Sequence, residues 1–345
     1  MKTIKDIAKE LGIAPSTVSR VLNKSGYYSK EVEEKVLKYV EETGFIYNQS
    51  AKMLRSKKSN TIGLIIPDIS NDFYSRIALI VDTFFSKRGY SIFICNTASD
   101  LKRELVAFKQ LVANQVNGII FLGYGSLLDD QFIKYDVPIV ALDRPYYGKL
   151  PATQIYSNDL DLSRQAGKLL IAKGCKKIRI LVREFNVLDD PSVLLDPSYQ
   201  KNGRVTGITE EILNRFPETD PLKLVEKIPY YRGMAIEESE KKVASLIAEE
   251  KDIDGLFCMS DNVAYGAVKA LKKAGKKIPD EVKVIGFDNN IYSSISSPSI
   301  TSVDRNVDTM ASTACLKLLE KIESGDKMSE ETIVIEGMLV ERETT

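Results

Sequence analysis

From Thr61 onward, short apolar runs alternate with longer amphipathic segments, and this alternation constrains the fold more than any other feature. The apolar runs have the length of buried strands, and the segments between them have the period of helices. Strands that alternate with helices form parallel sheets covered by helices on both faces. With about ten strands expected, two sheets of about five are favoured over one. We therefore predict an α/β core of two doubly wound parallel-sheet subdomains. The clearest strands are residues 62–66, 91–95, 118–122, 138–142, 178–182, 227–230, 255–259 and 282–287.

Polar residues follow most of these runs at the point where each strand would end. Ligands of parallel α/β sheets bind at the carboxyl ends of the strands, so polar groups gathered there predict a shared pocket. A single polar residue in such a place is usually a turn former, and the prediction depends on many strands sharing the feature. These residues are Asp68, Asn71, Asp72, Gly123, Tyr124, Asp143, Arg144, Asn158, Asp159, Arg183, Ser260, Asp261 and Asp288.

Residues 1–46 have a different pattern, that of three short helices. Thr3 can cap the first helix and Gly12 can end it, and Pro15 suits the first turn of the second. Two helices joined by so short a turn are typical of a helix-turn-helix unit. A third helix after Ser29 would complete the core of a small all-α head.

The second of these helices has one apolar stripe and one face of hydrogen-bonding side chains without an acid. That face carries Ser16, Thr17, Ser19, Arg20 and Asn23. Arg20 could donate to both acceptors of a guanine edge, and the hydroxyls could reach phosphates. An ordinary surface helix is the alternative, but the helix-turn-helix context favours double-stranded DNA as the partner.

Residues 48–56 resemble a further helix, capped by Asn48. Nine residues are fewer than the roughly 12–15 that an isolated helix needs for marginal stability. The segment is either a disordered tether or a hinge that folds on DNA beside its copy from a second subunit. Ala51 and Leu54 would share one face, and Leu54 could enter a minor-groove step.

Charge and composition narrow the class of protein further. The chain has no net charge, but residues 1–60 hold 12 Lys and Arg against 7 Asp and Glu, which indicates a polyanion partner for the head alone. Histidine is absent, and we find no phosphate loop or nucleophile elbow, so we predict no catalytic residues, no metal and no cofactor. The absence of a long apolar run or a secretory segment predicts a cytoplasmic protein without a membrane span. The cysteines are expected to be reduced thiols: Cys95, Cys175, Cys258 and Cys315.

Longer motifs are spread over nearly the whole chain. They are Ile4-Lys5-Asp6-Ile7-Ala8-Lys9, Ser16-Thr17-Val18-Ser19-Arg20-Val21-Leu22-Asn23, Ile62-Gly63-Leu64-Ile65-Ile66-Pro67-Asp68-Ile69-Ser70-Asn71, Asn117-Gly118-Ile119-Ile120, Arg204-Val205-Thr206-Gly207, Asp280-Glu281-Val282-Lys283-Val284-Ile285-Gly286-Phe287-Asp288 and Ile300-Thr301-Ser302-Val303. In combination they resemble the lac repressor/galactose repressor (LacI/GalR) family of bacterial transcriptional regulators.

The resemblance implies a helix-turn-helix head (1–46), a hinge helix and linker (47–60) and a periplasmic-binding-protein-like core (61–345) that binds an effector and forms a homodimer. The chain would cross between the subdomains near Ser157, Asp288 and Glu323. The N-subdomain would then hold about residues 61–157 and 290–322, and the C-subdomain about residues 158–289 and 323–345.

Positions carried over from the family give the expected site residues. The expected DNA contacts are Pro15, Ser16 and Arg20 at base edges, Thr17 and Asn23 at phosphates, and Ala51, Leu54 and Arg55 in the minor groove. The expected effector contacts are Phe73, Tyr74, Asp143, Arg204, Ser260, Asp288 and Arg305, and Tyr124 could stack on the ligand with Tyr74.

The chain departs from the family pattern mainly at the expected pocket. The usual Asp-Asn pair is inverted as Asn158-Asp159, Ser260 replaces the common Asn, and Arg183-Glu184 precedes a long loop to Asn202. In the head, Ala14 stands where the family usually has a Ser or Thr cap. We therefore predict an operator-binding dimeric repressor of a carbohydrate-utilisation operon, with a nucleoside or purine as the alternative effector. A cytoplasmic solute-binding protein and a sugar-modifying enzyme are the competing classes.

Overall fold

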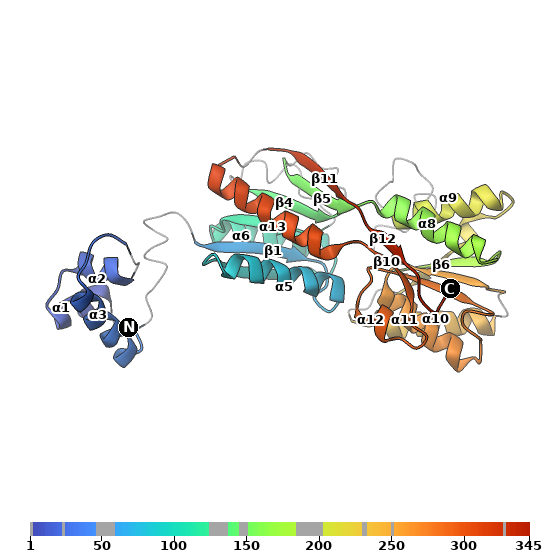
Figure 1. The fold of residues 1–345 in the computed structure, drawn as a ribbon, viewed down its shortest axis with the longest axis horizontal. Helices are drawn as coiled ribbons and strands as arrows, with labels where there is room; N and C mark the ends of the chain where they lie inside the picture. The colour runs from blue at the N-terminus through green and yellow to red at the C-terminus, as the bar shows by residue number, and fades with distance from the viewer. Residues whose placement is uncertain are drawn as a thin grey trace. The chain divides into compact units, whose positions relative to one another are not determined.

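The computed structural model describes residues 3–22, 25–45, 59–123, 137–144, 151–183, 203–229, 233–249, 252–326 and 329–345. They fall into two compact units, Met1–Ser59 and Asn60–Thr345, each of which we describe by itself. In the second unit, the strands form two six-stranded sheets (Figure 1). We call each sheet with its covering helices a lobe. In the described ranges, no helix is long and apolar enough to cross a membrane.

The first unit is a small helical head. Its helices are α1 (Ile4–Leu11), α2 (Pro15–Leu22) and α3 (Lys30–Thr43). Thr3 caps α1 in a capping box, and Gly12 ends it with a φ of 68°, a left-handed conformation that glycine adopts without strain. Ile7, Val18 and Val36, one from each helix, lie at the centre of the core. The predicted helix-turn-helix head is confirmed.

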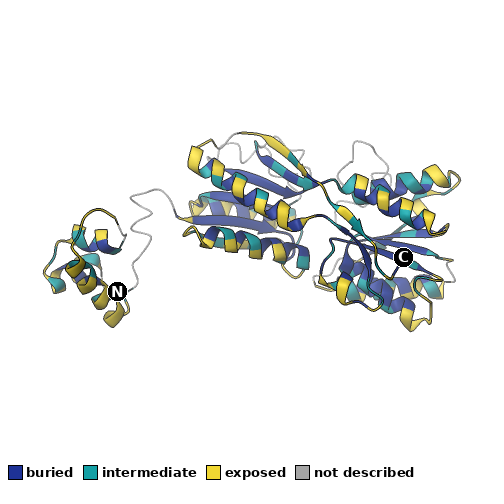
Figure 2. Cartoon of the chain, in the orientation of Figure 1, coloured by how far each residue is buried: buried dark blue, intermediate teal, exposed yellow. Residues whose placement is uncertain are grey.

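The first lobe contains a parallel sheet with the strand order β11-β5-β4-β3-β1-β2. Its strands are β1 (Thr61–Ile66), β2 (Ser91–Asn96), β3 (Gly118–Phe121), β4 (Ile139–Asp143), β5 (Thr153–Ser157) and β11 (Glu331–Ile335). Helices α5 (Asp72–Ser86) and α13 (Val307–Ser324) bury their apolar stripes against one face, and α6 (Leu101–Ala113) covers the other. Figure 2 shows the central strands buried and the outer sides of these helices exposed.

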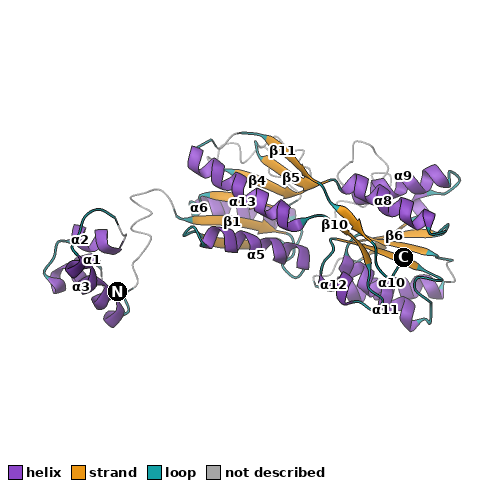
Figure 3. Ribbon diagram, viewed as in Figure 1, coloured by secondary structure: helices purple, strands orange, loops and turns teal. Residues whose placement is uncertain are grey.

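The second lobe has the strand order β12-β10-β9-β8-β6-β7, with only β12 antiparallel to its neighbour. Its strands are β6 (Ile178–Arg183), β7 (Val225–Ile228), β8 (Gly255–Cys258), β9 (Lys283–Phe287), β10 (Thr301–Asp304) and β12 (Met338–Val340). Its helices are α8 (Asp159–Ala172) and α9 (Gly203–Arg215) on one face, α10 (Ala235–Ala248) and α11 (Asp261–Lys273) on the other, and the short η3 (Pro221–Lys223) and α12 (Ile291–Ile295). This layering of helices on both faces of each sheet (Figure 3) confirms the predicted fold class.

Close packing of α8 with α9 and of α10 with α11 depends on two glycines. A Cβ atom on Gly207 would lie 2.2 Å from the carbonyl oxygen of Leu160, and one on Gly266 would lie 2.2 Å from that of Ile236. Glycine is therefore the residue that lets each pair of backbones approach so closely.

The chain crosses between the sheets at residues 157–159, 304–307 and 335–338. The first of these crossovers lies where we predicted one, but the predictions near Asp288 and Glu323 were wrong. Strand β10 pairs with β9 in the second sheet, and β11 pairs with β5 in the first. Residues 290–304 therefore belong to the second lobe, and residues 323–326 and 329–335 belong to the first. Neither strand was predicted from the sequence, because β10 is four residues long and mostly polar, and β11 is a largely exposed edge strand.

Candidate functional site

Two aspartates, one from each lobe, mark the candidate site. Asp143 is the last residue of β4, and Asp288 follows β9 directly. Their φ angles are 92° and 95°, values that non-glycine residues rarely adopt and that concentrate at functional sites. Both side chains are only 3% exposed, so the two carboxylates need partners within the protein.

Arg305, in the second crossover, contacts acids from both lobes. Its Nη1 donates to Oδ1 of Asp143 at 2.6 Å, and its Nη2 donates to the Asp143 carbonyl oxygen at 2.8 Å. Its Nε lies 2.9 Å from both Ser157 Oγ and Asp159 Oδ1. The same Nη1 is 3.8 Å from Oδ1 of Asp288. The planar fork of arginine allows one side chain, 1% exposed, to hold all these oxygens.

Arg204, near the start of α9, binds two of these acids, Asp159 and Asp288, from the second lobe. Its Nε donates to Oδ2 of Asp159 at 3.1 Å, and its Nη1 donates to the carbonyl oxygen of Met259 at 2.7 Å. Its Nη2 lies 3.2 Å from Oδ1 of Asp288. The guanidinium also lies 4.2 Å from the ring centre of Phe287, in a cation–π contact that fixes its plane. We call Asp143, Asp159, Asp288, Arg204 and Arg305 the inter-lobe cluster.

The two marker aspartates have pKa values shifted in opposite directions. Burial raises the pKa of Asp143, but Arg305, Arg144 and Arg204 together outweigh burial and lower that pKa to about 2. For Asp288, burial outweighs Arg204 and Arg305, and the pKa is raised. Oδ1 of Asp288 accepts no hydrogen bond, although Arg204 is near. A buried acceptor without a donor is a group that a ligand hydroxyl could satisfy.

Aromatic side chains from the first turn of α5 adjoin the cluster. Asn71 caps this helix by accepting a hydrogen bond from the Phe73 backbone N–H at 3.0 Å. The Tyr74 hydroxyl donates to Oδ2 of Asp143 at 3.3 Å, and the Phe73 ring centre lies 4.7 Å from the Arg305 guanidinium. Apolar rings beside convergent charged groups are the usual composition of a small-molecule site.

Most of the predicted effector contacts lie in or beside the inter-lobe cluster. These are Phe73, Tyr74, Asp143, Arg204, Asp288 and Arg305. Ser260, buried at the N-cap of α11, is next to the Met259 carbonyl that Arg204 bonds. Tyr124 lies outside the described residues. Asp159, which bonds both arginines, was among the strand-end polar residues predicted to share a pocket but was missing from the effector contacts carried over from the family.

In the head, α2 presents the face that we predicted to meet DNA. Pro15, Ser16 and Arg20 are exposed and Thr17 is half-buried, because Val18 and its apolar neighbours face the core. The helix carries no acid in its first turn and Arg20 in its last, which suits an anionic partner. The other predicted DNA contacts fall outside the described residues: Asn23, Ala51, Leu54 and Arg55.

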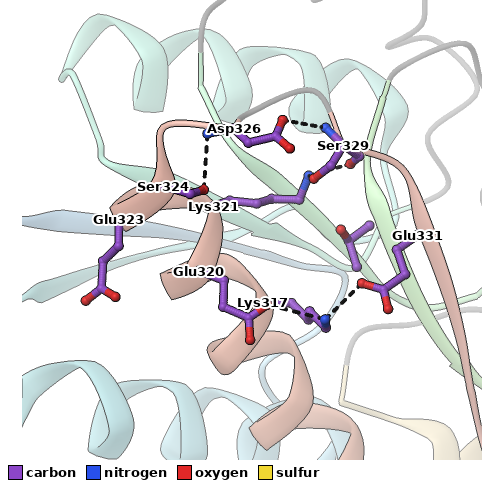
Figure 4. Close-up of a pocket in the computed structure, with 9 residues that line it drawn as sticks. Lys317, Glu320, Lys321, Glu323, Ser324, Asp326, Ser329 and Glu331 are labelled. Atoms are coloured by element: carbon purple, nitrogen blue, oxygen red, sulfur yellow. Dashed lines mark hydrogen bonds and ion pairs between the residues drawn. The ribbon is translucent and has the colours of Figure 1, made fainter.

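A depression of about 440 Å³ lies elsewhere on the first lobe, beside the first residues of β5 and β11 (Figure 4). Its lining residues are Thr153, Lys317, Glu320, Lys321, Glu323, Ser324, Asp326, Ser329 and Glu331. Its two lysines already have partners within the protein: Lys317 pairs with Glu320 and Glu331, and Lys321 donates to the Ser329 carbonyl oxygen at 2.5 Å. No group of three potential metal ligands occurs in the described part of the chain. The inter-lobe cluster is therefore the stronger candidate.

A helix-turn-helix head on a two-lobed α/β core defines a class of DNA-binding regulators with a ligand-binding domain. Three family models match the chain. They are bacterial regulatory proteins of the lacI family (residues 3–48), periplasmic binding proteins and sugar binding domain of the LacI family (residues 59–194), and a periplasmic binding protein-like domain (residues 168–345). The chain belongs to the LacI family of bacterial regulatory proteins.

Similar proteins match over nearly their full length. The ribose operon repressor of Halalkalibacterium halodurans is 32% identical over 345 residues, covering 100% of this chain and 97% of that protein. The transcriptional regulator RegA of Clostridium saccharobutylicum is 30% identical over 351 residues, covering 99% of each. Both are named as regulators, and neither is named as an enzyme.

Solved structures share the fold. The lac repressor dimer bound to operator and the anti-inducer ONPF superposes with a TM-score of 0.79 at 23% identity, covering 100% of this chain and 99% of that one. A periplasmic binding protein/LacI transcriptional regulator from Alkaliphilus metalliredigens, complexed with D-xylulofuranose, has a TM-score of 0.66 at 28% identity. That comparison covers 83% of this chain and 99% of the other.

Proposed function

We propose that this chain is a ligand-responsive transcriptional repressor of a carbohydrate-utilisation operon. It binds a pseudo-palindromic operator as a homodimer, and an effector bound at the inter-lobe cluster changes its affinity for DNA. Relatives named ribose operon repressor and sucrose operon repressor support the sugar operon. A regulator of this kind acts in the cytoplasm, at the nucleoid.

For DNA recognition, we assign base-edge contacts in the major groove to Pro15, Ser16 and Arg20, and phosphate contacts to Thr17 and Asn23. The exposure of the first three, and an apolar stripe turned into the head core, support this assignment. Minor-groove contacts at the dyad are assigned to Ala51, Leu54 and Arg55, on the resemblance alone.

For the effector, we assign a sugar or a similar polyhydroxylated ligand, with a pentose as the first candidate. Paired carboxylates and guanidiniums bind vicinal hydroxyls well, and Oδ1 of Asp288 lacks a hydrogen-bond donor. The relatives named for ribose and the neighbour complexed with D-xylulofuranose favour a pentose. The alternative is a nucleoside or purine, whose flat base could stack on Phe73 or Tyr74.

The proposed homodimer has a candidate surface on the first lobe. Strand β2 lies at the edge of its sheet, where Phe93 and Ile94 are 45% and 44% exposed. Leu79, on the neighbouring helix α5, is 66% exposed. An open edge strand with large apolar side chains is a surface that a second copy can cover.

The regulatory step is a shift between two relative settings of the lobes. An effector that contacts both Asp143 and Asp288 binds one setting better than the other, and the populations shift by that difference in affinity. The two first lobes of the dimer carry the hinge segments (residues 47–60), so the setting changes the spacing of those segments on DNA. Because nine residues form only a marginal helix, a small change in spacing can unfold them and release the operator.

One observation carries this proposal: acids from both lobes meet at Arg305, and Arg204 binds the two from the second lobe, in a chain whose head has an exposed, acid-free helix. A gel-shift assay with the DNA upstream of the chain's own gene tests it. We expect sequence-selective binding that D-ribose or another member of a panel of pentoses, hexoses, sugar phosphates, nucleosides and purines changes at least fivefold. Binding to competitor DNA with equal affinity would refute the repressor. Selective binding that no panel member changes would refute the sugar or nucleoside effector.

A further inference from the structure

The three crossovers are bonded to one another, so they form one structural unit between the lobes. Nδ2 of Asn158, in the first crossover, donates to Oε2 of Glu336 in the third at 2.5 Å, and its Oδ1 accepts from the Gly337 N–H at 3.0 Å. Gly337 also packs against the second crossover, because a Cβ atom there would lie 2.3 Å from the Asp304 carbonyl oxygen. A change in one crossover therefore disturbs the other two.

Arg305 connects this unit to the candidate effector site. It belongs to the second crossover, and its Nε contacts Ser157 and Asp159 in the first. Its two terminal nitrogens donate to Asp143 at the end of β4. With all three nitrogens engaged by protein oxygens and the side chain 1% exposed, Arg305 is poorly placed to contact a ligand directly.

Asp143, in contrast, has one carboxylate oxygen bound to Arg305 and the other turned toward Tyr74 and Arg144. Its Oδ1 faces Arg305, and its Oδ2 accepts from the Tyr74 hydroxyl and from Nε of Arg144, both at 3.3 Å. Contacts of 3.3 Å are long for charge-assisted hydrogen bonds, whereas the 2.6 Å contact with Arg305 is short. A ligand hydroxyl can therefore compete with Tyr74 and Arg144 for Oδ2. Any rotation of the carboxylate that results would change the hydrogen bond between Oδ1 and Arg305.

We propose that Arg305 is a positioning residue whose guanidinium clamps Asp143 to the crossovers. Through this clamp, a rotation of the Asp143 carboxylate changes the structure of the crossovers between the lobes. Geometry makes the fork essential, because a lysine ammonium could hold Asp143 or Asp159 but has no planar fork to span both. This role deepens the proposed function and rests on it where an effector is concerned.

The test is hydrogen–deuterium exchange on the effector-free full-length protein, comparing the parent with Arg305→Gln and Arg305→Lys. Arg76→Gln is the control, since Arg76 also binds an aspartate through two nitrogens, at Asp308 directly after the second crossover, but Arg76 is 44% exposed and Asp308 is not part of the inter-lobe cluster. We expect exchange to rise at least tenfold in peptides covering all three crossovers in both Arg305 variants, and to stay unchanged there in the control. Faster exchange confined to residues 304–307, or parental exchange in Arg305→Lys, would overturn the clamp.

A second measurement separates this inference from the proposed function. Affinity for the upstream DNA fragment is measured with and without each sugar or nucleoside of the panel, for the parent and for Arg305→Lys. We expect the parent to respond and the variant's ratio of affinities to fall to within twofold of one, while Arg76→Gln keeps the parental ratio. A full response in Arg305→Lys overturns the clamp. A parent that responds to nothing refutes the proposed effector, and the exchange measurement still decides the role of Arg305.

Discussion

Replacing Asp143 with asparagine should destabilise the protein most at neutral pH. Although burial raises the pKa of Asp143, its arginine neighbours lower it from 3.8 to about 2. At about 1.4 kcal/mol per pKa unit, preference for the carboxylate stabilises the folded state by about 2 kcal/mol at pH 7. The folded pKa lies below the unfolded one, so this stability is present above about pH 4 and is lost as the pH falls toward 2. Asparagine keeps the shape of the side chain but cannot offset the charge of Arg305.

Urea unfolding followed by circular dichroism, at pH 7 and pH 3, measures this effect. The loss of unfolding free energy in Asp143→Asn should be about 2 kcal/mol at pH 7 and roughly half of that at pH 3. The matched control is Asp308→Asn, which removes an ion pair with Arg76 whose acid is 60% exposed and should cost no more than about 0.5 kcal/mol. Equal losses for Asp143→Asn at both pH values, or a loss as small as the control's, would refute this electrostatic reasoning.

Three further predictions concern other sites. Burial raises the pKa of Asp288, so the charged carboxylate lowers the stability of the folded state once the pH exceeds the unfolded pKa. The variant Asp288→Asn should therefore unfold at an equal or higher urea concentration than the parent at pH 7. A lower urea midpoint would contradict this prediction. Gly266→Ala places a Cβ atom 2.2 Å from the Ile236 carbonyl oxygen and should lower the free energy of unfolding by about 1–3 kcal/mol, which calorimetry would detect as a lower Tm. An unchanged Tm would show that α10 and α11 can move apart without loss of stability. Arg20→Ala should weaken binding to the upstream DNA about ten- to a hundredfold in fluorescence anisotropy, with a smaller loss on competitor DNA. Parental affinity would show that α2 does not bind the bases.

The sequence pattern predicted the central strands well and the peripheral ones poorly. Runs such as residues 62–66 and 284–287 are buried on both faces, so they carry no charged residue and are easy to detect. Strand β5 alternates buried with half-buried residues, and β12 has only three residues. Strands like these gain their stability from pairing with distant partners, which a local pattern does not reveal.

The candidate site was predictable to the extent that it follows from strand ends. Asp143 and Asp288 could be found because each follows a well-marked apolar strand. Asp159 was missing from the expected effector contacts because it lies in the first crossover and binds an arginine from each of the other two parts of the site. The sequence pattern does not show which strands belong to which sheet, so it could not predict this meeting point. Arg305 follows a strand with no apolar run, and only the family resemblance pointed to it. That resemblance predicted an effector contact, whereas the burial of Arg305 supports a positioning role.

The most direct test of a coupled operator site and effector site is calorimetry with one effector and two forms of the protein. The ligand identified in the panel is titrated into the free protein and into the protein saturated with the upstream DNA fragment. Because coupling between two sites is reciprocal, we expect the two effector affinities to differ by the factor by which that ligand changes DNA affinity, on the order of 5- to 150-fold. Equal affinities for the free and the DNA-bound protein would contradict a regulator whose two lobes transmit effector binding to DNA.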